Sequence, residues 1–138
     1  AITLLHSKLT TYYKSGAIVI NGSDYWTLGS DFWNLAKNED VYSELKKSDL
    51  VIFKGDLNYR KLTGDREWEP TTPFSTAIQG LASLGLPVLS LRTCKADVIV
   101  GLAEGVNEKV CHEYEKMGNA NGQLWTSTGK WAVISFNN

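Results

Sequence analysis

The chain contains two clusters of side chains whose types suit the binding of a small anion or a sugar. The first follows an apolar run and a glycine, and its members are Asp56, Leu57, Asn58, Tyr59 and Arg60. The second follows another apolar run and contains Arg92 and Lys95. Arginine offers a planar fork of donors to phosphate oxygens, lysine a compact positive charge, and asparagine both a donor and an acceptor. The acid among them favours a phosphorylated polyol over a bare anion, because a carboxylate accepts hydrogen bonds from sugar hydroxyls.

Two short buried strands are expected to deliver these clusters. Asp49–Phe53 and Leu86–Leu91 are apolar runs of strand length, and each runs directly into a polar segment. In an open α/β sheet, ligands bind beyond the carboxyl ends of the strands. If the two strands are neighbours, both clusters lie at the same sheet edge. We therefore expect Asp56, Asn58 and Arg60 to line one site with Lys95.

The remaining sequence alternates between helical and strand patterns. The order predicts a three-layer α/β/α sandwich with a mostly parallel sheet. It shows no linker or internal repeat, so residues 1–138 are treated as one unit. Helices are expected over Thr3–Lys14, Asp40–Lys47, a segment opened by Pro73, and Asn107–Met117, and further strands over Ala17–Ile20 and Gly129–Phe136, the latter at a sheet edge.

Composition excludes several classes of protein. The 138 residues are 43% hydrophobic and carry a net charge of −1, which indicates a globular domain without broad attraction to nucleic acid or an anionic membrane. No apolar run approaches the roughly 20 residues that span a bilayer. Ala1–His6 lack the charged start of a signal peptide. Cys94 and Cys111 have no metal-type spacing, so we expect buried, reduced thiols and a cytoplasmic protein.

Each candidate residue also has a purely structural interpretation. Asp56 can cap the following turn while Arg60 makes a surface ion pair, and Arg92 and Lys95 can lie on a solvated loop instead of forming a second basic wall. A nucleophilic role for Cys94 is disfavoured, because no histidine lies near it in sequence. The aromatic side chains are expected mainly to pack. A solvated surface is expected for Lys61, Asp65, Arg66 and Glu67.

Together these motifs resemble the damage-control phosphatases, and most closely the subfamily III members marked by an Arg-Thr-x-Lys motif, which include acidic residue methyltransferase-like proteins. The resemblance is carried by Lys54–Asp65 and by Arg92-Thr93-Cys94-Lys95. It runs from about Tyr25 to Phe136 and includes Trp68, Pro73-Phe74 and Thr128-Gly129-Lys130. Both main motifs occur in the family's order and at a plausible separation.

The resemblance implies metal-dependent hydrolysis of phosphate monoesters, with sugar phosphates such as fructose 1-phosphate as substrates and Mn, Co, Ni or Mg as the divalent metal. It implies that substrate contacts come from the positions matching Asp56–Arg60 and Lys95. The family's metal ligands, an Asp-Asn pair and a further Asp, precede the matching region, and no Asp-Asn-x-Gly motif occurs here. The chain therefore resembles a C-terminal segment that needs the N-terminal part of the same protein as its partner. Two alternatives stay open: a non-catalytic phosphosugar-binding module and an S-adenosylmethionine-dependent protein carboxyl methyltransferase.

Overall fold

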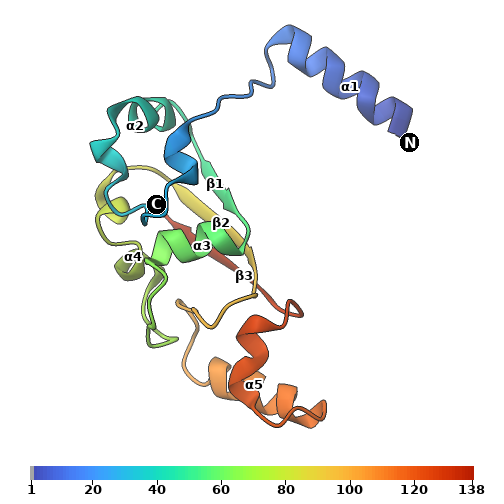
Figure 1. The fold of residues 1–138 in the computed structure, drawn as a ribbon, viewed down its shortest axis with the longest axis vertical. Helices are drawn as coiled ribbons and strands as arrows, with labels where there is room; N and C mark the ends of the chain where they lie inside the picture. Colours follow the sequence, from blue (N-terminus) through green and yellow to red (C-terminus); the bar gives the residue numbers. More distant parts are fainter. Residues whose placement is uncertain (1) are drawn as a thin grey trace.

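The computed structural model describes residues 2–138 and has a mixed α/β fold around a three-stranded sheet (Figure 1). The strands are β1 (Val51–Lys54), β2 (Val88–Thr93) and β3 (Ala132–Asn137), in the spatial order β1-β2-β3. β1 runs parallel to β2, and β3 runs antiparallel to it at the edge. The parallel pair places the carboxyl ends of β1 and β2 at the same edge of the sheet.

Most of the predicted elements are present, with ends displaced by one to three residues. The apolar runs that predicted strands near residues 50 and 88 form β1 and β2, and the terminal run forms β3. The α-helices are α1 (Ile2–Ser15), α2 (Glu39–Leu45), α3 (Asp56–Thr63), α4 (Phe74–Ala77) and α5 (Val106–Lys116). Short 3-10 helices cover Asp24–Thr27, Leu35–Lys37, Gln79–Ser83 and Gly122–Ser127.

One face of the sheet forms the main hydrophobic core. Strand side chains alternate between two faces, and Val51, Phe53 and Val88 all point to the buried side. Helix α3 packs on β1 and β2, and α4 lies against β3 (Figure 1). The core is completed by Phe32, Leu35, Tyr59, Leu62, Phe74, Ala77, Ile78 and Leu81.

The opposite face of the sheet is apolar but poorly covered by the described residues. We call it the open sheet face and define it as Ile52, Leu89, Leu91, Ile134 and Phe136, which share one side of the ladder by register. Ile52, Ile134 and Phe136 are 54%, 75% and 55% exposed. Residues 2–138 therefore form two layers, the sheet and the helices on its buried face.

The predicted strand at Ala17–Ile20 is wrong. Helix α1 forms where expected, but it projects from the body without burying any residue (Figure 1). The segment after it pairs with no strand, and Val19 and Ile20 are about four-fifths exposed. A strand needs a neighbouring ladder for its backbone groups, and this short apolar run does not reach the free edge of β1.

A smaller hydrophobic cluster lies beyond the carboxyl end of β2. Helix α5 and the turn Gly122–Ser127 pack together there, with Trp125 and Tyr114 around the buried Cys111. Cys94 belongs to the same cluster, so both cysteines are free and buried as expected. This cluster supports the loop that follows β2 from the side away from α3.

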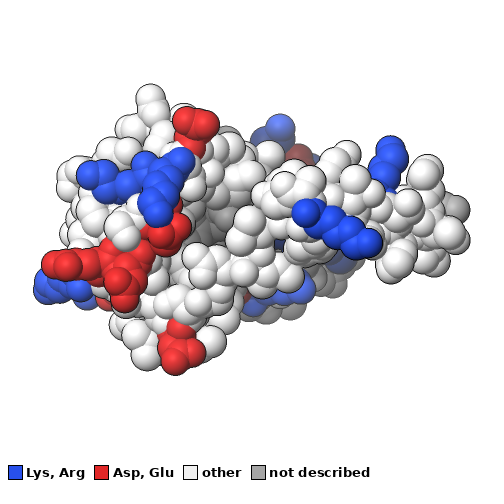
Figure 2. All heavy atoms as spheres, turned by 90° about the horizontal axis from the view of Figure 1, so that it is seen from above, with Lys and Arg blue, Asp and Glu red and all other residues white. Residues whose placement is uncertain are grey.

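The surface shows no single dominating charge on the face seen in Figure 2, where acidic and basic side chains lie side by side over the body. The projecting helix α1 carries Lys8 and Lys14 and no acidic residue. None of the described helices is long and apolar enough to cross a membrane. Asp65, Arg66 and Glu67 are exposed as expected.

The expectation for Lys61 is wrong, because this side chain is buried. Its ammonium donates to the carbonyl oxygens of Trp26 and Leu28, at 3.2 and 2.6 Å, and lies 4.5 Å from the ring centre of Phe32. A buried ammonium requires such partners, and they come from a loop about 35 residues earlier in the chain. The charged residues 65–67 that follow Lys61 suggested a solvated surface and did not reveal these carbonyl partners.

Candidate functional site

The turn between β1 and α3 places the start of the helix at the carboxyl edge of the sheet. Gly55 has φ +102° and ψ 163°, a backbone conformation that other residues adopt only with strain. Helix α3 begins at the next residue, so its first-turn N–H groups, which have no partner inside the helix, lie at the end of β1. Asn58 Nδ2 donates to the carbonyl of Lys54 over 2.9 Å and closes the turn.

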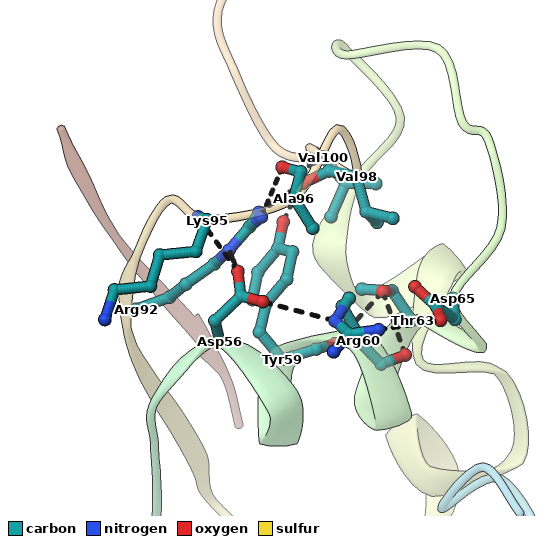
Figure 3. Close-up of polar contacts among 10 residues, drawn as sticks. All are labelled: Asp56, Tyr59, Arg60, Thr63, Asp65, Arg92, Lys95, Ala96, Val98 and Val100. Atoms are coloured by element: carbon teal, nitrogen blue, oxygen red, sulfur yellow. Dashed lines mark hydrogen bonds and ion pairs between the residues drawn. The ribbon is translucent and has the colours of Figure 1, made fainter. Parts of the chain in front are cut away.

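Asp56 joins this turn to the loop after β2 (Figure 3). Its Oδ1 accepts hydrogen bonds from Arg92 Nε at 2.8 Å and from the backbone N–H of Lys95 at 3.1 Å. Its Oδ2 accepts from Arg60 Nε at 3.2 Å. The two sequence clusters therefore meet at one edge of the sheet, as the parallel arrangement of the two strands required.

Arg92 is enclosed by the protein, so both earlier interpretations of this residue, as a basic wall and as part of a solvated loop, are wrong. Only 2% of it is exposed. Besides Asp56, its guanidinium donates to the carbonyls of Val98 and Ala96, the latter at 2.7 Å, and it lies 4.3 Å from the ring centre of Tyr59. The residue lies on the buried face of β2 because it follows Val88 and Ser90 at alternating positions.

Arg60 occupies the other side of the Asp56 carboxylate. Besides its contact with Asp56, it donates from Nη1 to Asp65 at 3.1 Å, and about a third of its side chain is exposed. The structural interpretation is therefore confirmed for the ion pairs of Arg60, whereas no side-chain hydrogen bond caps the start of α3, so the expected capping role of Asp56 is wrong. Arg60 and Ala96 also line a cavity of about 1240 Å³, whose other walls include Trp68, Asp97 and Asn107.

Two of the candidate residues in the first turns of α3 have opposite environments. Tyr59 is fully buried, and its hydroxyl accepts from the backbone N–H of Val100 at 3.0 Å. Leu57 is 62% exposed. The side chain of Tyr59 is thus unavailable to a ligand, whereas Leu57 offers an apolar surface and a backbone N–H beside the turn.

Lys95 presents the free cation of the site. Its backbone is tied to Asp56, but its side chain is exposed and forms no ion pair within residues 2–138. Figure 3 shows its ammonium extending away from the Asp56 carboxylate and from Arg60. An anion that binds this ammonium therefore does not have to displace a protein carboxylate.

The electrostatics keep Asp56 ionised and Cys94 protonated. Burial by itself raises the pKa of Asp56, but the hydrogen bonds from Arg92, from the Lys95 amide and from Arg60, together with the Arg92 charge, hold the pKa of the carboxyl below its usual 3.8. Burial raises the pKa of the Cys94 thiol although Arg92 acts in the opposite direction. Cys94 is therefore a poor nucleophile at neutral pH.

The donor set of this site does not fit a divalent metal ion. Both oxygens of Asp56 already accept hydrogen bonds from cationic side chains. In the part of the chain that the structure describes, no three His, Cys, Asp or Glu side chains gather in a way that could hold a metal. No chemical step at these residues is therefore assigned to a metal.

Sequence reasoning missed two parts of the site. It did not identify Arg92 as the buried link between β2 and α3, although the alternation Val88, Ser90, Arg92 pointed to the core. It also missed the loop carbonyls and amides of residues 96–100, which bind Arg92 and Tyr59. The sequence shows the types of the side chains but not which backbone groups will lie beside them, so only the fold could reveal these contacts.

Comparison with known proteins places this geometry in a family. Residues 3–110 match the family described as the damage-control phosphatase ARMT1-like domain. The chain is 50% identical over 111 residues to damage-control phosphatase ARMT1 of Xenopus tropicalis. These aligned residues are 80% of this chain and 23% of that protein. Over 126 residues it is 42% identical to the Danio rerio protein of that name and 38% identical to the Homo sapiens one, covering 91% of this chain and 26% of each relative. The chain thus spans about a quarter of the length of the curated relatives it matches, and it belongs to the damage-control phosphatase ARMT1-like family.

Proposed function

We propose that this chain forms the substrate-binding part of a phosphatase that acts on sugar phosphates such as fructose 1-phosphate. The observation that carries the proposal is the position of the unpaired Lys95 ammonium on the loop that Asp56 ties to the start of α3. The names of the relatives, damage-control phosphatases, support the phosphatase class. The sugar-phosphate substrate is the part of the proposal that rests on the resemblance carried by Lys54–Asp65 and Arg92–Lys95.

The proposed binding mode uses the start of α3 and Lys95 together. Helix N-termini bind phosphate through free N–H groups and the helix dipole, and α3 opens directly at the sheet edge. The Lys95 ammonium neutralises the phosphoryl oxygens, as fixed positive groups do during phosphoryl transfer. Asn58 and Arg60 border the same turn and orient the remainder of the substrate.

The metal belongs to another part of the complete protein in this proposal. A divalent ion such as Mn²⁺, Co²⁺, Ni²⁺ or Mg²⁺ supplies an electrophile and activates water in metal-dependent hydrolysis. Asp56 is fully engaged by donors, so the ligands come from residues outside this chain. The role of the present residues is to hold and orient the phosphorylated sugar.

We also propose that residues 1–138 are the C-terminal segment of an α/β/α domain whose third layer comes from the N-terminal part of the same protein. Two observations support this. The open sheet face exposes large apolar side chains that a third layer would bury. The relatives are about three and a half times as long as this chain, so they contain enough additional polypeptide to form such a layer.

The test is hydrolysis of fructose 1-phosphate by the full-length protein with Mn²⁺, Co²⁺ or Ni²⁺. Lys95→Met is expected to raise KM about ten- to a hundredfold, since a hydrogen bond to a charged group is worth about 1.5–3 kcal/mol. Lys109→Met is the matched control, because Lys109 is an exposed lysine on α5 without an ion pair in the described chain. Unchanged kinetics for Lys95→Met would contradict the proposed site.

A binding module without turnover is the second candidate. It is favoured by the lack of a metal-holding group within residues 2–138. Calorimetry measures whether this chain binds fructose 1-phosphate in the presence of a chelator. Together with the hydrolysis assay on the full-length protein, it distinguishes a binding module from a phosphatase. Binding by the chain with no turnover by the full-length protein in any of the three metals supports the module.

A further inference from the structure

Asp56 is surrounded by donors from its own protein and has little surface left for a ligand. Three hydrogen bonds reach its two oxygens, from Arg92, Arg60 and the Lys95 amide. Only 13% of its side chain is exposed. We infer that Asp56 and Arg92 are positioning residues that fix the loop carrying Lys95, an inference that rests on the proposed function and reassigns Asp56 from substrate contact to support.

Arg92 holds this loop from the inside. Its three nitrogens donate to three different groups, the Asp56 carboxylate and the carbonyls of Ala96 and Val98. The two carbonyls belong to the first and third residues after Lys95, so the guanidinium fixes the backbone that follows the cation. The planar fork of arginine supplies this geometry, and lysine has no equivalent.

Further contacts secure both ends of the same loop. The amide of Cys94 donates to the Trp131 carbonyl at 2.8 Å, which ties the start of the loop to the chain just before β3. The amide of Val100 donates to the Tyr59 hydroxyl, which ties the far end to α3. Tyr59 also lies against the guanidinium of Arg92. Lys95 is therefore an exposed residue, like Asp97, in a loop whose neighbouring backbone groups are fixed.

The charge arrangement explains why an acid belongs beside an anion-binding site. A free carboxylate would repel a phosphoryl group, whereas Asp56 is neutralised by Arg92 and Arg60. In return it compensates a buried guanidinium, which could not remain charged in the core without a partner. The Lys95 ammonium remains unpaired and points away from this carboxylate (Figure 3).

Two ligands distinguish positioning from direct contact. Inorganic phosphate has no sugar hydroxyls, so a carboxylate that accepts from the sugar contributes nothing to its binding. If Asp56 acts by positioning Lys95, Asp56→Asn weakens inorganic phosphate and fructose 1-phosphate by the same factor, about tenfold, in calorimetry on the full-length protein. A loss confined to fructose 1-phosphate overturns the inference.

A double-mutant cycle adds a second test. In Lys95→Met protein, Asp56→Asn is expected to cost little further affinity, because the cation it positions is already absent. Additive losses would show that Asp56 acts on the ligand independently of Lys95. Arg92→Lys is expected to reproduce the effect of Asp56→Asn, and Glu44→Gln, in an exposed pair with Lys47, is the control for a lost surface charge.

Hydrogen exchange keeps the inference testable if the proposed function fails. Asp56→Asn and Arg92→Lys are expected to speed exchange of the Lys95 and Val100 amides by at least tenfold, while the amides of α5 are unchanged. This result is independent of any ligand. Unchanged exchange at Lys95 overturns the positioning role, and failure of the wild-type protein to bind either phosphate ligand overturns the proposed function alone.

Discussion

Arg92 Nε lies 2.8 Å from Asp56 Oδ1, although 36 residues separate the two in sequence. The contact joins the end of β2 to the first residue of α3, and the arginine side chain is completely enclosed. Each charge stabilises the other in the folded protein, because a buried ion without a partner is strongly unfavourable. The stability of the fold and the shape of the candidate site therefore depend on the same pair.

Removing Arg92 should destabilise the chain strongly. We expect Arg92→Ala to lower the free energy of unfolding by about 3–5 kcal/mol, because it strands a partly buried carboxylate and leaves two loop carbonyls without a donor. Denaturant titration measures the loss. Lys47→Ala is the control, since Lys47 forms an exposed pair with Glu44 and should change stability by no more than about 1 kcal/mol. Similar losses for the two variants would contradict the role of the buried pair.

The depressed pKa of Asp56 predicts a loss of stability in acid. The folded-state pKa lies below the usual 3.8, so this group contributes stability above its unfolded pKa and loses it as the pH falls through the folded pKa. Asp56→Asn lacks this titration. The difference in unfolding free energy between wild type and Asp56→Asn should be largest near neutral pH and should shrink below about pH 4. A constant difference from pH 6 to pH 2 would refute the assignment.

The sequence was informative where local pattern and tertiary environment agree. The apolar runs before Gly55 and Arg92 predicted two neighbouring strands, and the parallel pair then brought Asp56 and Lys95 to one edge. Prediction was wrong where the partner lies far away in the chain. Lys61 is buried because carbonyl oxygens of an earlier loop accept hydrogen bonds from its ammonium, and Ala17–Ile20 is no strand because it pairs with no neighbouring strand.

Gly64 should tolerate substitution less well than another glycine with a similar backbone. Gly64 has φ +73°, and a Cβ there would collide with the ring of Trp33, whose indole N–H is held by the Leu62 carbonyl at 2.8 Å. Gly85 has φ +66° and open space around it. Gly85→Ala should cost about 1 kcal/mol from backbone conformation alone. Gly64→Ala should cost at least about 1 kcal/mol more, since overpacking adds to that strain.

Thermal unfolding of the two glycine variants, analysed together with denaturant titration, measures this difference. A second variant, Gly64→Ala combined with Trp33→Leu, tests its cause, because the smaller side chain removes the collision. If the steric explanation is correct, Gly64→Ala costs less in the Trp33→Leu background than in the wild type. An equal cost in both backgrounds would leave only the backbone conformation as the explanation.

The open sheet face predicts self-association of the chain when it is prepared alone. Ile134 and Phe136 are 75% and 55% exposed on edge strand β3, and exposed apolar edges promote pairing between molecules. We expect light scattering to show concentration-dependent association, which Ile134→Lys with Phe136→Lys reduces. The double variant should change the free energy of unfolding by about 1 kcal/mol or less, because neither side chain contributes to the core. A wild-type chain that stays monomeric at high concentration would show that this face needs no cover, and would remove its support for a third layer.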